Sequence, residues 1–245
     1  MKKFIVFGLL ASKIVFGATI TVAAAADLRF VLQDLTALYE KEYPQDKLKF
    51  IYGASGNFYN QIRAGYPIDV FMSADTHYPE LLYKQGLSYK PRAYAIGKLA
   101  LFTVENNINV DNPKLALLQA KKIAIANPRV APYGIAGIST LHCYHIYHNV
   151  KDKIVFGENI IQTAQYVASK NADVGLVSYS LLLTPQLKGK GKIYLIPQAC
   201  YKPIVQSAAV IKATKDKNAA MRFFNFLYSQ EAIAIWKSFG YGIPR

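Results

Sequence analysis

The sequence predicts an α/β protein of two lobes, each with a mainly parallel sheet flanked by helices. Strand and helix signals alternate along almost all of the 245 residues, which is the pattern of parallel strands joined by helices. Two long apolar stretches, 94–104 and 204–211, are expected to carry the chain between the lobes. We therefore assign residues 18–93 plus 208–245 to lobe one and residues 94–207 to lobe two. A chain of this length that is 52% hydrophobic can bury a sizeable core.

The N-terminus has the features of a secretory signal peptide, and we expect residues 1–17 to be one. A basic start at 1–3 precedes an apolar run at 4–10, and Gly17 and Ala18 supply small residues for cleavage. The apolar run is far shorter than the roughly 20 residues that a membrane-spanning helix needs. The pattern therefore predicts export rather than a membrane anchor.

The formal net charge of +14 favours anionic partners. The lysines are scattered singly or in pairs such as Lys121-Lys122, with no basic run and no nucleic-acid-binding motif. We therefore do not expect nucleic acid to be the partner.

The first strand signal runs directly into a helix signal. Residues up to Val22 are β-branched and alternate, and from Asp27 apolar residues recur at helical spacing until the chain reaches Pro44. Asp27 is therefore a candidate N-cap. The alanines at 23–26 leave backbone N–H groups accessible at the positive end of the helix dipole. Such a junction is suited to binding an anion.

The later elements follow the same alternation. We expect strands at 48–52, 68–73, 122–126, 154–156 and 173–177, and helices at 58–64, 76–83, from 113, after the loop 127–137, and at 159–169, 216–228 and 230–239. The last two helices are amphipathic and are expected to bury Phe223, Phe226, Ile233 and Trp236.

Four strand-to-helix turns result, two in each lobe. They lie at Ala26-Asp27, Ser55-Gly56, Tyr133-Gly134 and Asn159-Ile160. Ligands of open α/β sheets bind beyond the carboxyl ends of the strands, and a helix N-terminus stabilises a nearby negative charge by about 0.3–1 kcal/mol. Hydroxyl and amide donors without a counter-charge fit a dehydrated divalent oxyanion. Taken singly, Ser55 and Asn159 are each better explained as a helix cap than as a ligand contact.

Several motifs occur in a fixed order along the chain. They are Ala-Ala-Ala-Ala-Asp-Leu at 23–28, Gly-Ala-Ser-Gly at 53–56, Asp-Val-Phe-Met-Ser-Ala-Asp at 69–75, Tyr-Ala-Ile-Gly-Lys-Leu at 94–99, Ala-Pro-Tyr-Gly at 131–134 and Tyr-Lys-Pro-Ile-Val-Gln at 201–206. Together they resemble the periplasmic molybdate-binding proteins of ABC transporters, the ModA family, from about Thr19 to Arg245.

The resemblance implies a type II periplasmic binding protein with its ligand in the cleft between the lobes. The ligand would be molybdate or tungstate, and the partner an ABC permease of the inner membrane. The resemblance further implies a monomer in the periplasm, without a cofactor and without enzymatic activity.

Position by position, the resemblance assigns the oxyanion to five residues. They are Ala26, Asp27, Ser55, Tyr133 and Ile160. Ser55 can donate through its hydroxyl, whereas Ala26 and Ile160 can donate only through the main chain. Ser178 stands where the family often has a tyrosine, with Tyr179 beside it, and both are possible additional contacts.

Asp27 departs from the family pattern, which leads us to expect serine or asparagine. A carboxylate facing an anion at about 4 Å costs roughly 4 kcal/mol at an effective dielectric of about 20. We therefore hypothesise that Asp27 turns back as the helix N-cap, or is protonated and donates a hydrogen bond.

Another tetrahedral oxyanion is the alternative ligand. Sulfate would accept the same donors, and phosphate could place its proton on Asp27, so cavity size would decide among them. The sequence alone leaves this choice open.

A zinc-dependent or serine hydrolase is a more remote alternative. The segment 53–57 lacks the last glycine of a G-x-S-x-G motif, and no Walker or dinucleotide fingerprint is present. His142, His145, His148 and Cys143 could hold zinc, but their spacing spreads them around a helix, so we expect a solvated helix end and no cation site. We expect Cys143 and Cys200, the two cysteines, to be free buried thiols rather than a disulfide.

Overall fold

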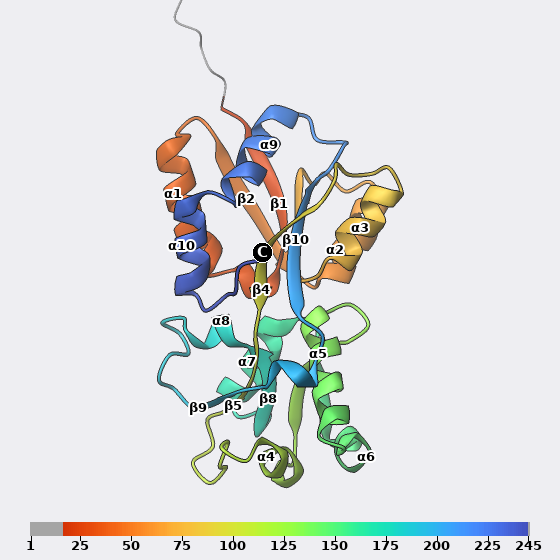
Figure 1. The fold of residues 1–245 in the computed structure, drawn as a ribbon, viewed down its shortest axis with the longest axis vertical. Helices are drawn as coiled ribbons and strands as arrows, with labels where there is room; N and C mark the ends of the chain where they lie inside the picture. Colours follow the sequence, from red (N-terminus) through yellow and green to blue (C-terminus); the bar gives the residue numbers. More distant parts are fainter. Residues whose placement is uncertain (1–16, 245) are drawn as a thin grey trace, which may run out of the picture.

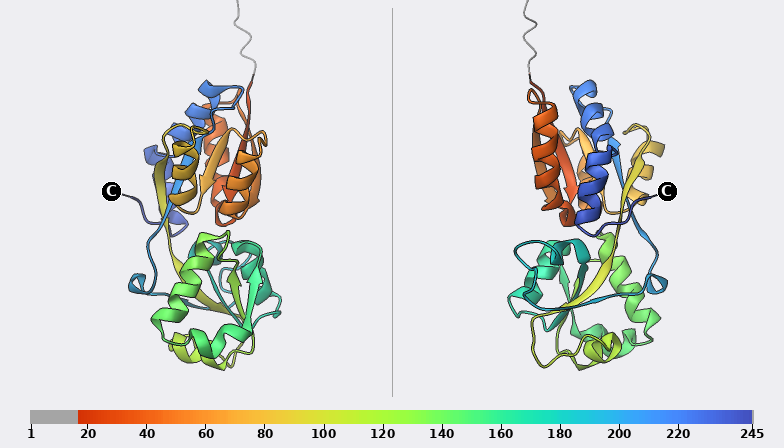
Figure 2. Two further views of the ribbon diagram at one scale, coloured as in Figure 1. Left: turned by 90° about the vertical axis from the view of Figure 1, so that its right-hand side faces the viewer. Right: turned by 60° about the vertical axis from the view of Figure 1, so that its left-hand side comes forward.

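The computed structural model describes residues 17–244 as two lobes joined by two extended crossings (Figure 1). Helices cover both faces of the sheet in each lobe (Figure 2). The expected signal peptide lies almost entirely outside the described residues. The two-lobed α/β architecture predicted from the sequence is confirmed.

Lobe one is built on five strands. Its elements are β1 (Thr19–Ala25), the 3-10 helix η1 (Ala26–Leu28), α1 (Val31–Glu42), β2 (Lys47–Gly53), α2 (Ser55–Arg63), β3 (Val70–Ser73), α3 (His77–Lys84), β4 (Arg92–Gly97), β10 (Ile204–Val210), α9 (Lys217–Phe226) and α10 (Gln230–Ser238). The strand order is β2-β1-β3-β10-β4. Helices α1, α9 and α10 lie on one side of this sheet, and α2 and α3 lie on the other (Figure 1).

Lobe two is built on the intervening chain. Its elements are β5 (Leu99–Thr103), α4 (Pro113–Gln119), β6 (Ile123–Ala126), α5 (Pro132–Cys143), α6 (Tyr147–Val150), η2 (Lys151–Lys153), β7 (Ile154–Gly157), α7 (Ile160–Ala168), β8 (Val174–Ser178), α8 (Tyr179–Leu182), β9 (Lys192–Leu195) and η3 (Gln198–Cys200). The strand order is β7-β6-β8-β5-β9.

Both sheets are mixed rather than wholly parallel. The pairs β2-β1, β1-β3, β7-β6 and β6-β8 are parallel. The pairs formed by β10 and by β5 are antiparallel. The strands with antiparallel partners, β10 and β5, are those by which the chain enters a lobe from a crossing. The direction in which the chain enters each lobe therefore accounts for the antiparallel pairs in both sheets.

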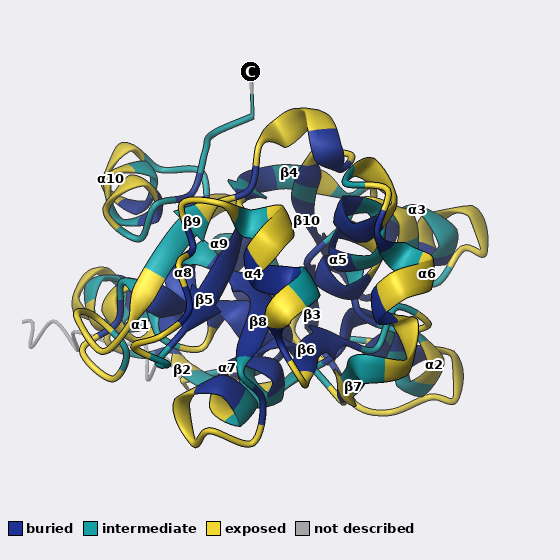
Figure 3. Ribbon diagram, turned by 90° about the horizontal axis from the view of Figure 1, so that it is seen from below, coloured by how far each residue is buried: buried dark blue, intermediate teal, exposed yellow. Residues whose placement is uncertain are grey.

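The central strands of lobe two are buried along their whole length, as Figure 3 shows for β5, β6 and β8. A sheet covered on both faces needs apolar residues at every position, which explains the continuous apolar runs in the sequence. Gly137 of α5 lies over Ile125 and Leu176, whereas Val167 of α7 lies over Gly175. Adjacent positions in a strand face opposite sides, so α5 and α7 cover opposite faces of the sheet.

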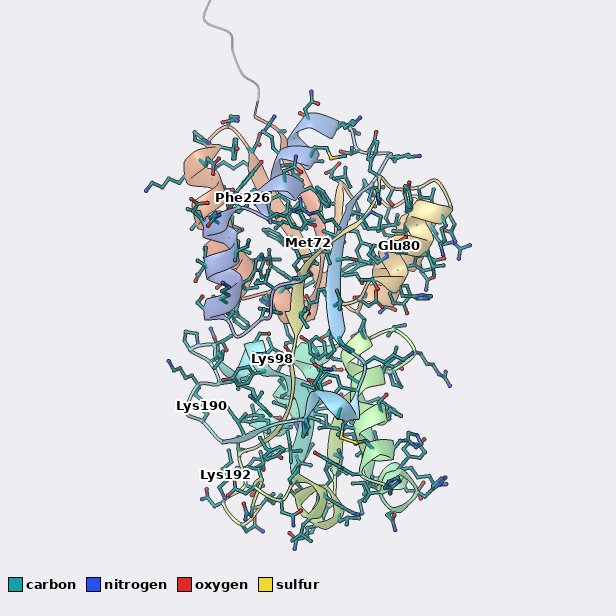
Figure 4. All side chains as sticks on the ribbon, viewed as in Figure 1. Met72, Glu80, Lys98, Lys190, Lys192 and Phe226 are labelled. Atoms are coloured by element: carbon teal, nitrogen blue, oxygen red, sulfur yellow. A yellow bond between two sulfur atoms is a disulfide. The ribbon has the colours of Figure 1, made fainter. Side chains whose placement is uncertain are left out.

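The two crossings differ in detail from the expected ones. The stretch 94–104 forms two strands in different sheets, β4 and β5, which Lys98 links at the junction of the lobes (Figure 4). The returning chain joins the first sheet at Ile204. Strand pairing therefore assigns residues 17–97 and 204–244 to lobe one, and places the crossings a few residues from the expected boundaries at 93/94 and 207/208.

The C-terminal helices pack against lobe one as expected from their apolar faces. Phe223, Phe226 and Trp236 are buried, whereas Ile233 is only half-buried. Within residues 17–244, we find no helix with the length and hydrophobicity needed to cross a bilayer.

The expectation of two free thiols is wrong, because Cys143 and Cys200 form a disulfide (Figure 4). The fold brings the end of α5 beside η3, with the two Cα atoms 5.2 Å apart across a sequence separation of 57 residues. Cys143 is exposed rather than buried. The bond closes a large loop within lobe two.

We expect a Cys143→Ser/Cys200→Ser variant to lose about 2–4 kcal/mol of unfolding free energy, because a disulfide across a long loop restricts the unfolded chain. Urea unfolding of the wild type, with and without a reductant, measures the same loss. The double variant is the control, since the reductant should leave its stability unchanged. Equal stability of the oxidised and reduced wild type would contradict the prediction.

Candidate functional site

Four helix N-termini surround one small enclosed cavity between the lobes. The cavity has a volume of about 10 Å³. It is lined by Ala25, Ala26, Asp27, Gly53, Ala54, Ser55, Ala74, Ala131, Pro132, Tyr133, Asn159 and Ile160. Asp27, Ser55 and Tyr133 are at most 2% exposed, so the two lobes are closed over this space. No lysine, arginine or histidine is among these lining residues.

Ser55 begins α2 and offers two donors. As the first residue of the helix, its backbone N–H has no acceptor within the helix. Its hydroxyl oxygen accepts a hydrogen bond of 3.0 Å from the N–H of Ala74. Because that contact uses the oxygen as an acceptor, the hydroxyl proton remains available for a guest in the cavity.

Ile160 begins α7 on the other side of the cavity. The side chain of Asn159 caps this helix and accepts hydrogen bonds from the N–H groups of Ile161 and Gln162, at 3.0 and 3.1 Å. The N–H of Ile160 is not used by this cap. Asn159 therefore satisfies the next two N–H groups and leaves that of Ile160 as a donor at the cavity wall.

The remaining two helix starts contribute only backbone groups. Tyr133 follows Pro132 at the first turn of α5, and the carbonyl of Ala131 accepts from Gly134 and Ile135 but not from Tyr133. The 3-10 helix η1 begins at Ala26, directly after β1. Small alanines on the wall give a guest access to these N–H groups.

The carboxylate of Asp27 is held by three neutral donors from distant parts of the chain. Its Oδ2 accepts hydrogen bonds from Gln206 Nε2 at 2.6 Å, from the Tyr241 hydroxyl at 2.9 Å and from the Tyr133 hydroxyl at 3.2 Å. Gln206 belongs to β10, where a register shift beside β4 follows it. Such irregularities can redirect a side chain. We call Asp27, Tyr133, Gln206 and Tyr241 the hinge cluster.

The expectation that Asp27 is the helix N-cap is wrong. Ala25 occupies the N-cap position of η1 and makes no side-chain capping bond, and the long helix starts only at Val31. The side chain of Asp27 turns instead to the hydroxyl and amide donors of the hinge cluster, which are buried with it. These three donors replace the single backbone N–H that a capping carboxylate would accept.

Burial raises the pKa of Asp27, and the hydrogen bonds from Gln206, Tyr241 and Tyr133 oppose that rise. Burial also raises the pKa of the Tyr133 and Tyr241 hydroxyls well above their usual range. Both tyrosines therefore stay neutral and act as hydrogen-bond donors.

The lobes also touch at the edge of the cavity. The N–H of Gly56 donates to the carbonyl of Val130 at 2.9 Å, and the Tyr78 hydroxyl donates to the carbonyl of Arg129 at 3.4 Å. A Cβ at Gly56 would lie 2.6 Å from the Tyr78 hydroxyl and 3.0 Å from Val130 Cα. Glycine at this position is therefore a condition for the close approach of the lobes.

A family model described as "Bacterial extracellular solute-binding protein" matches residues 20–242. The chain belongs to this family. This solute-binding protein is 33% identical to the molybdate-binding protein ModA of Rhodobacter capsulatus, over 89% of this chain and 86% of that protein. It is 34% identical to ModA of Azotobacter vinelandii, over 92% of this chain and 90% of that protein.

A solved structure supports the same grouping. The periplasmic molybdate-binding protein of Azotobacter vinelandii superposes with a TM-score of 0.87 at 33% sequence identity, covering 92% of this chain and 100% of that chain. The fold of this chain is thus similar to that of a solved periplasmic molybdate-binding protein.

The structure brings together all five residues that the sequence assigned to the ligand. Ala26, Asp27, Ser55, Tyr133 and Ile160 line the one cavity. Ser178 and Tyr179 are outside the lining. Ser178 instead donates a hydrogen bond of 3.0 Å to the hydroxyl of Tyr133, which itself lines the cavity.

Sequence reasoning assigned no role to Gln206 and Tyr241 of the hinge cluster. A feature of the sequence could have indicated a role for Gln206, because it is the one amide side chain within the apolar strand Ile204–Val210. Tyr241 had no such feature, since a tyrosine near the C-terminus is not distinctive by itself. The contact of Tyr241 with Asp27 depends on the return of the chain across β4, where Gly242 pairs with Ile96.

The residues considered for hydrolase chemistry are used otherwise. Cys143 is bound to Cys200, and His142 stacks on Tyr147 with ring centroids 4.4 Å apart. Residues 17–244 contain no group of three His, Cys, Asp or Glu side chains placed to hold a metal ion. The hydroxyl of Ser55 faces the N–H of Ala74, and the cavity lining supplies no histidine as a base.

We expect Gly56→Val to oppose closure of the lobes by about 1–3 kcal/mol, because the added side chain must displace Tyr78 or Val130. Small-angle X-ray scattering measures the effect as a larger radius of gyration than that of the wild type under the same conditions. Asn60→Ala, an exposed position on the same helix, is the control and should compact normally. Full compaction of Gly56→Val would show that this contact does not limit closure.

Proposed function

We propose that this solute-binding protein captures molybdate or tungstate between its lobes and delivers the anion to an ABC permease. The observation that carries the proposal is the convergence of the helix starts at Ala26, Ser55, Tyr133 and Ile160 on one enclosed cavity. Each start offers a backbone N–H, and those of α2, α5 and α7 lie at the positive end of an α-helix dipole. A guest with acceptor oxygens on several sides satisfies all of them.

The donor set favours an inorganic dianion over an organic solute. The donors are neutral N–H groups and one hydroxyl, which can satisfy a dehydrated oxyanion without a buried cation. The cavity is close to the space that one water molecule needs. A tetrahedral oxyanion requires only a small outward movement of the lining, whereas a sugar or peptide requires the lobes to separate.

In this proposal each predicted residue has a distinct role. Ser55 donates through its hydroxyl and N–H, and Ile160 and Tyr133 donate through N–H groups from lobe two. Ala26 and Asp27 contribute the N–H groups of η1. The anion therefore contacts both lobes and stabilises their closed arrangement.

The proposed setting follows from the relatives. The named ModA proteins of Rhodobacter capsulatus and Azotobacter vinelandii are molybdate-binding proteins, and the solved Azotobacter protein is described as periplasmic. We extend that location and ligand to this chain, with delivery to a permease in place of catalysis. A monomer suffices, since one chain supplies the entire cavity lining.

Titration of the ligand-free protein with molybdate, tungstate, sulfate and phosphate tests the proposal. Trp236 is the only tryptophan of the chain, and its ring lies 5.0 Å from that of Tyr94 and 5.6 Å from that of Tyr241. Its emission should therefore respond when the hinge cluster rearranges. We expect saturation by molybdate and tungstate at micromolar concentrations or below. Saturation by sulfate or phosphate alone would redirect the proposal to those anions.

We expect Ser55→Ala to weaken molybdate binding about 10- to 100-fold, because it removes one charge-assisted hydrogen bond worth about 1.5–3 kcal/mol. Isothermal titration calorimetry measures the change. Ser169→Ala, at an exposed position after α7, is the matched control and should bind like the wild type. An unchanged affinity of Ser55→Ala would exclude the hydroxyl from the anion contacts.

A further inference from the structure

The two carboxyl oxygens of Asp27 have different surroundings. Oδ2 accepts from Gln206, Tyr241 and Tyr133, as described above. Oδ1 is buried and has no hydrogen-bond partner among the described residues. A buried carboxyl oxygen without a donor is costly when the group is charged. The structure thus leaves Oδ1 in need of either a proton or a guest.

The position of Asp27 indicates that the partner of Oδ1 is the anion in the cavity. Asp27 lines the anion cavity and is 2% exposed. Its Oδ2 is committed to the hinge cluster, so Oδ1 is the carboxyl oxygen left for the cavity. We propose that Asp27 takes up one proton from solution when a dianion enters, and donates it in a hydrogen bond from Oδ1 to an anion oxygen. This inference rests on the proposed function and specifies how the site tolerates a carboxyl group.

The proton resolves the conflict between two negative charges in one closed cavity. With a carboxylate on Asp27, the anion would meet a like charge in a site from which water is excluded. After protonation, Oδ1–H becomes a neutral donor like the Ser55 hydroxyl, while Oδ2 remains an acceptor for the hinge cluster. The step is balanced, because the carboxylate and one solvent proton give the carboxylic acid, and the anion enters unchanged.

The groups that face Asp27 are neutral, so none of them supplies a positive charge to offset its carboxylate. A proton taken from solution can supply that charge. The facing groups are Tyr133 from α5, Tyr241 from the C-terminal segment, Tyr94 from β4 and the neutral amide of Gln206. Burial raises the pKa of the three tyrosines well above their usual range, so all three stay neutral. None of the ion pairs among residues 17–244 includes Asp27.

Proton uptake gives molybdate binding a defined pH dependence. Burial raises the pKa of Asp27 in the free protein, and the anion raises it further in the complex. Between these two pKa values the affinity falls as pH rises, by about tenfold for each pH unit. At pH values below the pKa of Asp27 in the ligand-free protein, Asp27 already carries its proton, so the affinity for molybdate does not change with pH.

Hydrogen phosphate should behave differently from molybdate. It carries its own proton at neutral pH and can donate it to an ionised Asp27, so its binding would need no proton from solution. Molybdate, tungstate and sulfate carry no such proton. The site would then accept a protonated oxyanion when Asp27 is ionised and an unprotonated oxyanion when Asp27 is protonated.

Calorimetry in buffers with different enthalpies of ionisation tests the inference. Titrations with molybdate from about pH 6 to about pH 9 give the number of protons taken up for each anion bound. We expect that number to rise from near zero toward about one as pH increases, while the dissociation constant rises in parallel. Molybdate binding without proton uptake at any pH would overturn the inference and leave the proposed function intact. No molybdate binding at all would overturn both.

Two variants of the hinge cluster sharpen the test. Asp27→Asn supplies a permanent neutral donor of the same shape, so its molybdate affinity should be independent of pH, with no proton uptake. Tyr241→Phe keeps the carboxyl group but removes a hydrogen bond that lowers the pKa of Asp27, so the decline in affinity should move to higher pH. Asp34→Asn, at an exposed position of α1, is the control and should match the wild type. A pH dependence that persists in Asp27→Asn would assign it to another group.

Discussion

Backbone N–H groups at the start of a helix have no acceptor inside that helix, and this constraint organises the molecule. Here the starts of η1, α2, α5 and α7 place such groups around a single closed cavity. A buried donor left without an acceptor costs about 1–3 kcal/mol. Closed lobes are therefore stable when something rich in acceptor oxygens lies between them. The small residues on the cavity wall allow a guest to reach the main chain.

The hinge cluster connects this cavity to the crossings between the lobes. Tyr133 comes from lobe two, whereas Asp27, Gln206 and Tyr241 come from lobe one. The Tyr133 hydroxyl sits against the end of the first crossing, where a Cβ on Gly97 would lie 2.1 Å from it. The same phenol therefore contacts both the carboxyl group of the cavity wall and the end of the first crossing between the lobes.

The sequence was informative where local rules determine structure. Alternating strand and helix signals predicted the architecture, and turns at Ser55, Tyr133 and Ile160 predicted the cavity wall, because a helix start is visible as a break in apolar periodicity. It was not informative where contacts join distant segments. The bonds of Asp27 to Gln206 and Tyr241 span 179 and 214 residues. The pairing of Cys143 with Cys200 likewise depends on where α5 ends relative to η3.

The disulfide also ties the helix that starts at the cavity wall to the returning crossing between the lobes. It fastens the far end of α5 to Cys200, only a few residues before β10 enters lobe one at Ile204. Since Tyr133 lies in the first turn of α5, this helix runs from the cavity wall to the disulfide. Lys98, between β4 and β5, and the short segment 201–203, between η3 and β10, are the links that join the two lobes. The disulfide therefore holds the helix that starts at the cavity wall close to the point where the chain returns to lobe one.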